Sequence, residues 1–289
     1  MKIINKLTGK IVAAAFVVLA FAACQKMDRP ALAADFPTDT NEPGGPLNFY
    51  AAFDGTTTDA RMNAVDSIRA TFASDNPLQS ADGISGKALQ GEAKKFVKYA
   101  KPNDWAVKAE SFTISFWYKK DGQTKNNLGG NGPEYIFSFK SSNGHWSGAS
   151  GFVFLEGNNT AAAVKVMFVD ANNKDNWFTW ESAAEMIPGL LNNQWHHMAL
   201  VYNAGTSTMT LYVDGVANPN VKTWANHGKI NLDDSKITEF RVGAGPHSDM
   251  NHVNDAWLAS TFKGNIDQLR FYSVALPANE ITALYTNKQ

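Results

Sequence analysis

Apolar and polar side chains alternate along most of the chain beyond residue 47, with the period of two that is typical of β-strands with one buried face. Residues 111–118 (SFTISFWY) give the clearest example, because large apolar side chains occupy every second position from Phe112 to Tyr118. Helical periodicity is confined to residues 277–285, where a single terminal turn is expected. The same alternation predicts further strands at 48–53, 87–90, 135–139, 151–155, 164–169, 176–180, 195–202, 209–213 and 262–272.

Glycine, asparagine and aspartate separate these runs, and Asp214-Gly215 is a strong signal for a tight hairpin turn. Many short strands, frequent turns and almost no helix predict an all-β protein built as a sandwich or a barrel. The stretch 47–289 has a suitable length for one large domain of this kind.

Residues 1–23 have the pattern of a signal peptide rather than of a folded element. Three lysines precede an apolar run of 13 residues, 11–23, which is too short for a comfortable membrane span. The run ends in Phe21-Ala22-Ala23-Cys24, which resembles a bacterial lipobox and predicts that Cys24 is lipidated. The alternative is a stray cysteine in an ordinary signal peptide. Because Cys24 is the chain's only cysteine, an internal disulfide is excluded.

Residues 24–46 are rich in proline and glycine and predict a flexible tether between the lipid and the domain. The segment Gln25-Lys26-Met27-Asp28 resembles the export signals of surface lipoproteins in some Gram-negative bacteria. These features predict an outer-membrane lipoprotein, held to the membrane by its lipid and facing the cell surface.

The charge of the chain argues against nucleic acid as a partner. Removal of residues 1–23 takes away three lysines and no acid, which leaves 23 basic against 27 acidic residues. No basic run is present, whereas phosphate neutralisation needs clustered cations.

Two blocks in the C-terminal half carry a family resemblance. The first is WHHMALVY at 195–202 followed by MTLYVDG at 209–215, and the second is FKGNIDQLRFY at 262–272 followed by Leu276 and Glu280-Ile281. Together, in this order, they resemble laminin-G-like, concanavalin A-like jelly rolls. The resemblance implies a β-sandwich of two antiparallel sheets. It does not select a function, because lectins, hydrolases and adhesion modules share this fold.

The resemblance also implies a calcium site. In jelly rolls of this family the first and last strands are neighbours, so Asp54 and Asp267 are expected to meet, and such domains often hold one calcium ion there. Carboxylate and carbonyl oxygens are the ligands that calcium prefers, and Gly55 would let the backbone approach the ion. In the alternative, Asp54 caps a turn and Asp267 pairs with Arg270 or Arg241.

Tryptophans in polar loops are the main candidates for contact with a sugar. A flat exposed ring can stack on the apolar face of a sugar while nearby amide and carboxylate groups bind its hydroxyls. In the alternative, the rings cover small satellite cores beneath long loops. Residues 177 and 180 lie on opposite faces of one strand, so only one of them should face the core. The candidate ligand residues are Trp146, Trp177, Trp180, Trp257, Asn143 and Asp175.

The histidines give weaker signals. His196 and His197 are consecutive strand residues, so their side chains point to opposite faces and cannot easily chelate one ion. His247 and His252 lie in a dense polar loop, which could bind a metal or be a simple polar turn.

Catalytic motifs of related enzymes are not found in the sequence. The Glu-x-Asp-x-x-Glu strand of laminarinase-like hydrolases, the Gln-Ile-His strand of jelly-roll lyases and a Ser-His-Asp elbow are all missing. The sequence therefore predicts a non-catalytic, lectin-like domain that binds carbohydrate. A module that binds a surface protein is the main alternative, and a glycoside hydrolase is less favoured.

Overall fold

The computed structural model describes residues 45–57, 61, 63–65, 71–72 and 78–288. The predicted signal peptide, Cys24 and residues 24–44 of the predicted tether lie outside the described residues. None of the helices in the described part of the chain is long and apolar enough to cross a bilayer.

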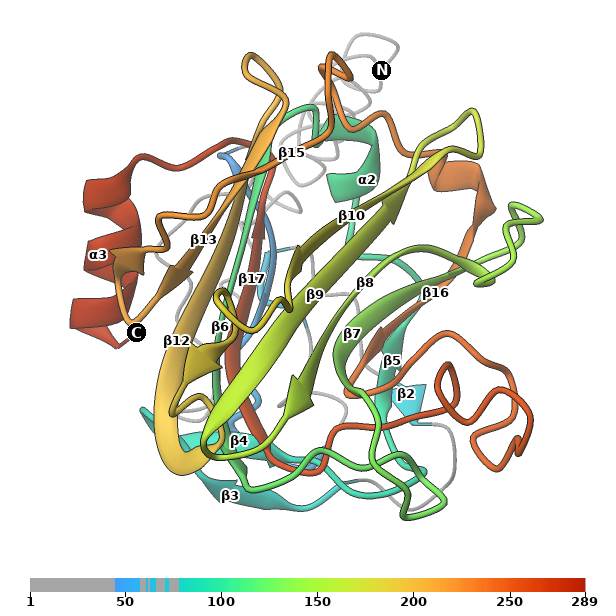
Figure 1. Ribbon diagram of the computed structural model, residues 1–289, viewed down its shortest axis with the longest axis vertical. Coiled ribbons are helices and arrows are strands. Elements are labelled where there is room, and N and C mark those ends of the chain that lie inside the picture. The colour runs from blue at the N-terminus through green and yellow to red at the C-terminus, as the bar shows by residue number, and fades with distance from the viewer. Residues whose placement is uncertain (1–44, 58–60, 62, 66–70, 73–77, 289) are drawn as a thin grey trace, which may run out of the picture. The chain divides into compact units, whose positions relative to one another are not determined.

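Two antiparallel sheets pack face to face (Figure 1). The spatial order of the first is β14 (Val216–Ala217), β13 (Thr208–Val213), β12 (Asn192–Asn203), β6 (Phe112–Asp121), β17 (Asn265–Tyr272), β4 (Lys87–Gln90) and β3 (Ser80–Asp82). Two more strands join it off this path: β1 (Leu47–Ala51) pairs with β17, and β15 (Lys222–Thr223) pairs with β13.

The second sheet has the order β10 (Asp175–Trp180), β9 (Ala161–Val169), β8 (Ala149–Gly157), β7 (Glu134–Ser141), β16 (Ile237–Val242), β5 (Val97–Tyr99) and β2 (Thr71–Phe72). The short β11 (Ile187–Pro188) pairs with β9. The helical elements among the described residues are α2 (Trp105–Lys108), the 3-10 turn η1 (Asp234–Lys236) and α3 (Ala278–Asn287). This arrangement confirms the predicted jelly-roll sandwich.

The core between the sheets is built from every second residue of each strand, as the period of two requires. Phe112, Ile114 and Phe116 of β6 are fully buried there. Trp105 of α2, which the sequence patterns did not predict to be helical, contacts the ring of Phe112 at 5.3 Å between centroids. Its Nε1 donates a hydrogen bond to the Tyr272 carbonyl oxygen at 3.0 Å, so the polar group of this buried tryptophan has a partner.

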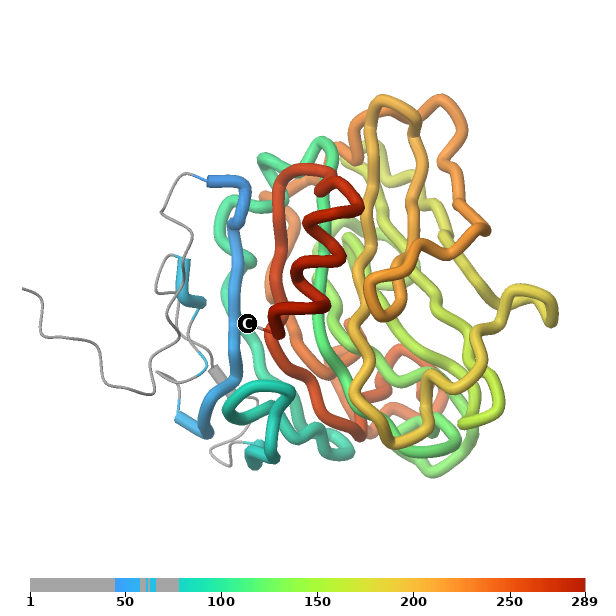
Figure 2. Tube along the Cα trace, turned by 90° about the vertical axis from the view of Figure 1, so that its left-hand side faces the viewer, coloured from blue at the N-terminus to red at the C-terminus, as the bar shows by residue number. Residues whose placement is uncertain are grey.

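The opposite face of β6 is buried as well, which differs from the expected half-buried strand. Helix α3 spans ten residues rather than one turn and lies along the outer side of the first sheet (Figure 2). Its Tyr285 stacks on Trp117 with centroids 5.6 Å apart and an angle of 22°. The polar-looking face of the strand is therefore covered by the C-terminal helix.

Candidate functional site

An aromatic cluster covers the outer face of the second sheet. Phe152 and Phe154 of β8 point away from the main core and are fully buried against Trp177 of β10. The loop 243–264, between β16 and β17, adds Trp257, whose ring lies 5.2 Å from Phe154 and 6.1 Å from Trp177. Trp146, from the loop between β7 and β8, completes the cluster at 6.4 Å from Trp257.

We call Trp146, Trp177 and Trp257 the aromatic platform. The three tryptophans differ in exposure: Trp177 and Trp257 are partly buried, whereas Trp146 is 62% exposed. The platform therefore combines a satellite core beneath the loops with one large flat ring in solvent. Trp146 is the member that can stack on a ligand without rearrangement of the fold.

Trp180, also a candidate sugar contact, is not available to a ligand. Its side chain is fully buried in the core between the sheets, and its Nε1 donates to the Asn220 carbonyl oxygen at 2.6 Å. The prediction that only one of Trp177 and Trp180 faces the core is correct, and Trp180 is that residue.

The two polar candidates beside Trp146 have different roles. Asn143 uses both ends of its amide within the loop: Oδ1 accepts from the His145 N–H at 3.0 Å, and Nδ2 donates to the Ala149 carbonyl oxygen at 3.1 Å. It shapes the loop instead of facing a ligand. Asp175 is exposed, and its Oδ2 lies 3.8 Å from His145 Nε2. Burial lowers the pKa of the His145 imidazole.

The sequence patterns missed two features of this face. Phe152 and Phe154 were expected in a strand but not as the base of a surface cluster, because nothing local tells which face of a buried strand meets solvent. Lys165 of β9 was also missed; its ammonium lies 3.0 Å from Glu156 and 2.5 Å from Glu181. The hydrogen bond from Lys165 lowers the pKa of the Glu181 carboxyl.

Asp54 and Asp267 converge on the turn between β3 and β4. Pairing of β1 with β17 brings the two residues to the same end of the first sheet, as the family resemblance implied. Asp267 Oδ2 accepts from the Ile84 N–H at 2.8 Å, and Asp54 Oδ1 accepts from the Lys87 N–H at 2.7 Å. Both acceptors thus hold the turn between β3 and β4.

Burial makes this carboxylate pair electrostatically unusual. Asp267 is fully buried, and desolvation, followed by the nearby charge of Asp54, raises the pKa of its carboxyl to about 8. Burial also raises the pKa of Asp54. The Oδ1 of Asp267 is buried without a hydrogen-bond partner among the described residues. Two close acids, one of them with an unpaired buried oxygen, form a donor set that fits a hard cation.

The backbone around the pair is built to admit the carboxylates. A Cβ on Gly86 would lie 2.2 Å from Asp54 Oδ1, and one on Gly83 would lie 2.5 Å from Asp267 Oδ2. Phe53 and Gln268, the immediate neighbours of the two acids, have φ values of 60° and 49°. Positive φ at non-glycine residues is uncommon and concentrates at ligand sites.

Gly55 has a different contact from the one expected. Its carbonyl oxygen accepts a hydrogen bond from Arg61 Nε at 2.7 Å. Its part in metal binding stays a prediction, whereas Gly83 and Gly86 leave open the space that the two carboxylates occupy.

The histidine candidates lie where their sequence context indicated. His196 Nδ1 lies 2.8 Å from Asp214 Oδ2, and His197 Nε2 lies 2.8 Å from Ser115 Oγ, so the two side chains have separate surroundings. His247 and His252 come together with Asp255, whose Oδ2 lies 3.8 and 3.9 Å from their ring nitrogens. The Asp255 N–H also donates to His252 Nδ1, so this loop partly satisfies its own polar groups.

Comparison with known proteins identifies the family. Residues 95–282 match the family described as the concanavalin A-like lectin/glucanases superfamily. The match spans more than half of the chain, which therefore belongs to this superfamily. Among curated proteins, none matches the chain.

Solved structures give the same fold. Domain 4 of AbnA, a GH43 extracellular arabinanase from Geobacillus stearothermophilus in complex with arabinotriose, superposes with a TM-score of 0.54 at 18% identity, covering 83% of this chain and 98% of that one. The receptor binding domain of botulinum neurotoxin mosaic serotype C/D has a TM-score of 0.54 at 14% identity, covering 84% of this chain. The binding domain of Paraclostridial Mosquitocidal Protein 1 has 0.55 at 15%, also covering 84%. This chain spans about half the length of the two toxin domains, 51% and 52%.

Proposed function

We propose that this protein binds carbohydrate on the aromatic platform and does not act on it chemically. The observation that carries the proposal is Trp146, a residue that is 62% exposed and lies beside the partly buried ring of Trp257, which packs on the buried Phe154. An exposed aromatic ring beside further aromatic rings forms the kind of flat apolar surface that ligands cover. The arabinotriose complex of a protein with the same fold supports a sugar as that ligand.

The acids near this face support a binding role over hydrolysis. A retaining glycosidase needs one carboxyl with a raised pKa beside a free carboxylate. Glu156 and Glu181 instead share the Lys165 ammonium, and the pKa of Glu181 is lowered. An ion-paired carboxylate is a poor proton donor, so the non-catalytic function is preferred.

Calcium is proposed as a structural ion at Asp54 and Asp267. The two carboxylates would hold it, and its charge would offset the repulsion between them and the burial of Asp267. The ion would thereby tie the start of β17 to the turn between β3 and β4. Its role is to stabilise the sandwich, because the carboxylate pair and the aromatic platform lie on different sheets.

The predicted lipid on Cys24 would present the domain at the outer face of the outer membrane, where a glycan binder could capture its ligand. Incorporation of a labelled fatty acid by cells expressing the protein tests the anchor. Label should enter the natural chain and be lost in Cys24→Ala.

The binding proposal is tested by a glycan-array screen of the full chain in detergent, with and without a calcium chelator. Glycan binding should be lost in Trp146→Ala and retained in Trp195→Ala, which is the matched control. Trp195 is partly exposed on β12 of the first sheet and lies under Lys119 at 5.6 Å. Stacking contributes a few kcal/mol at most, so a loss of about tenfold or more is expected. Absence of glycan binding by the folded protein would favour the adhesion-module alternative.

A further inference from the structure

A cavity of about 530 Å³ with a mixed polar and apolar lining lies at the turn that joins β9 to β10. Its other wall is the segment 224–231, which precedes β16. The volume is within the range of about 300–1,000 Å³ that small-molecule sites occupy. The lining includes five side chains that can donate hydrogen bonds, namely Lys174, Lys229, Asn172, Asn226 and Asn231.

The cavity walls are held by hydrogen bonds among their own residues. The carboxylate of Asp170, 5% exposed, accepts from the N–H groups of Asn172 at 2.9 Å and Lys174 at 2.8 Å. Its other oxygen lies 3.3 Å from His227 Nε2. The Ala171 N–H donates to the Asn231 carbonyl oxygen at 2.8 Å and so joins the two walls.

The ring of His227 stacks on Trp224 with centroids 3.5 Å apart and an angle of 20°. Trp224 in turn packs against the main core, where it contacts Phe178 at 6.4 Å. The imidazole is therefore fixed by a hydrogen-bonded neighbour and a stacked neighbour. A floor of this kind is formed before any ligand arrives, which reduces the ordering cost of binding.

The charges around the cavity favour an anion. The carboxylate of Asp170 is the only acid in the lining, and three donors already surround it. Lys229 pairs with Glu110. Lys174 is exposed and makes no ion pair with any residue that the structure describes. The cavity therefore offers one ammonium without a counter-ion and several amide groups.

We infer that this cavity binds the carboxylate-bearing unit of an acidic sugar, a uronate. Lys174 pairs with the carboxylate, and the carboxamides of Asn172 and Asn226 bind ring hydroxyls. The inference rests on the proposed glycan-binding function and adds the ligand class to it. Lys174 and Trp177 are three residues apart along extended backbone, so their side chains point to opposite faces and the cavity is a site separate from the aromatic platform.

The experiment is calorimetric titration of the full chain in detergent with tri-galacturonate and with its neutral counterpart, galactotriose. We expect the acidic trimer to bind at least about tenfold more tightly, the difference that one charge-assisted contact supplies. Lys174→Ala should remove this preference and leave the affinity for galactotriose unchanged, whereas Lys174→Arg should keep it. Lys108→Ala, which removes a lysine from α2 and lies outside the cavity, should change neither affinity.

The outcomes separate this inference from the proposed function. Equal affinity for the two trimers, or an unchanged preference in Lys174→Ala, overturns the uronate site. If Trp146→Ala still abolishes binding of both trimers in that case, the platform proposal stands. If neither trimer binds the folded protein and an array detects no other glycan, both proposals fail. If Lys174 pairs with the carboxylate, raised salt should weaken binding of the acidic trimer and leave binding of galactotriose unchanged.

Discussion

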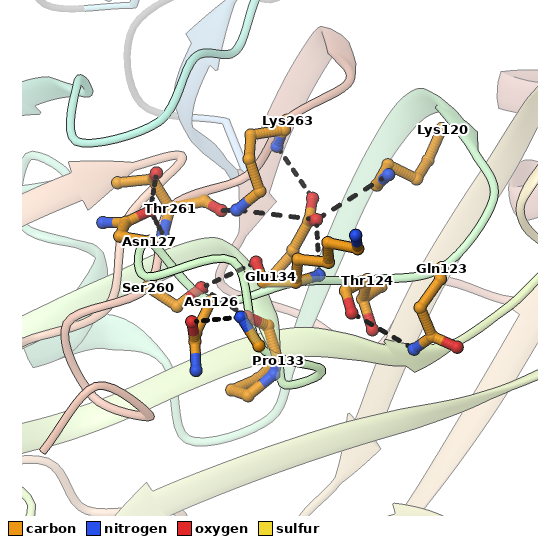
Figure 3. A network of polar contacts seen from close by, with 12 residues as sticks. Lys120, Gln123, Thr124, Asn126, Asn127, Pro133, Glu134, Ser260, Thr261 and Lys263 are labelled. Carbon is orange, nitrogen blue, oxygen red and sulfur yellow. Dashed lines mark hydrogen bonds and ion pairs between the residues drawn. The ribbon is translucent and has the colours of Figure 1, made fainter.

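Glu134 is the centre of a buried charge network that joins the loop after β6 to the loop before β17 (Figure 3). It is fully buried; Oε1 accepts from the Lys125 N–H at 3.0 Å and Oε2 from the Lys263 N–H at 2.8 Å. The ammonium groups of Lys120 and Lys263 lie 3.7 and 3.5 Å from Oε1. Burial lowers the pKa of Lys263. One carboxylate thus serves two cations and two backbone donors.

Glu134→Gln keeps the shape of this side chain and removes its charge. One of the two backbone N–H groups then faces an amide NH₂ instead of an acceptor, which costs about 1–3 kcal/mol for a buried donor. The ammonium groups also lose their counter-ion. Breaking a buried pair by removing one partner typically costs about 3–5 kcal/mol, and we expect the free energy of unfolding to fall by that amount.

Thermal unfolding followed by circular dichroism at pH 7 measures the effect. A loss of about 3–5 kcal/mol corresponds to a decrease in Tm of about 10 °C for a domain of this size. Glu92→Gln is the matched control, because Glu92 pairs with Lys95 at 2.9 Å on the surface. Its Tm should change by less than about 2 °C. A Glu134→Gln protein that melts within 2 °C of the natural one would refute the argument.

Three further results are expected. Burial, followed by the charge of Arg270, lowers the pKa of His197 to about 4, whereas the pKa of histidine in the unfolded chain is near 6.5. As the pH falls, the unfolded chain therefore binds this proton first, and the free energy of unfolding should decrease by about 3 kcal/mol between pH 6.5 and 4. Chemical denaturation at each pH measures this loss, which should be absent in His197→Gln. Calcium at 100 times its Kd should stabilise the natural protein by about 2.7 kcal/mol and leave Asp267→Asn unchanged in the same melts. Gly86→Ala should weaken calcium binding in titrations, because its Cβ would overlap Asp54 Oδ1 at 2.2 Å and its φ is +63°.

The fold could be predicted because the signal is local and repeated. Strands such as 111–118 carry their own period of two, and the two C-terminal blocks carry the family resemblance. Strands β5 and β16 were not among those predicted. The burial of Thr113, Ser115 and Trp117 could not be predicted in this way. This burial depends on the packing of α3 against the outer face of the first sheet. The pattern within residues 111–118 contains no information about where α3 packs.

The carboxylate pair was predictable only through topology. Asp54 and Asp267 are 213 positions apart, and only the neighbouring first and last strands bring them to one place. The turn that both acids bind was not predicted as part of the site. Its Gly83 and Gly86 are ordinary turn residues until the positions of the two carboxylates are known.

The aromatic platform shows why the alternation of strand residues between two faces cannot by itself select a ligand residue. Positions 177 and 180 must lie on opposite faces of β10, but the second sheet is apolar on both: Val153 faces the main core, and Phe152 faces outward. Either tryptophan therefore satisfied the pattern. The loop 243–264 determines which aromatic ring of the outer face stays exposed, because its Trp257 covers part of that face while Trp146 remains in solvent. The residues available to a ligand thus depend on how far the long loops extend over a sheet, and Trp146 is the platform residue that the loop 243–264 leaves exposed.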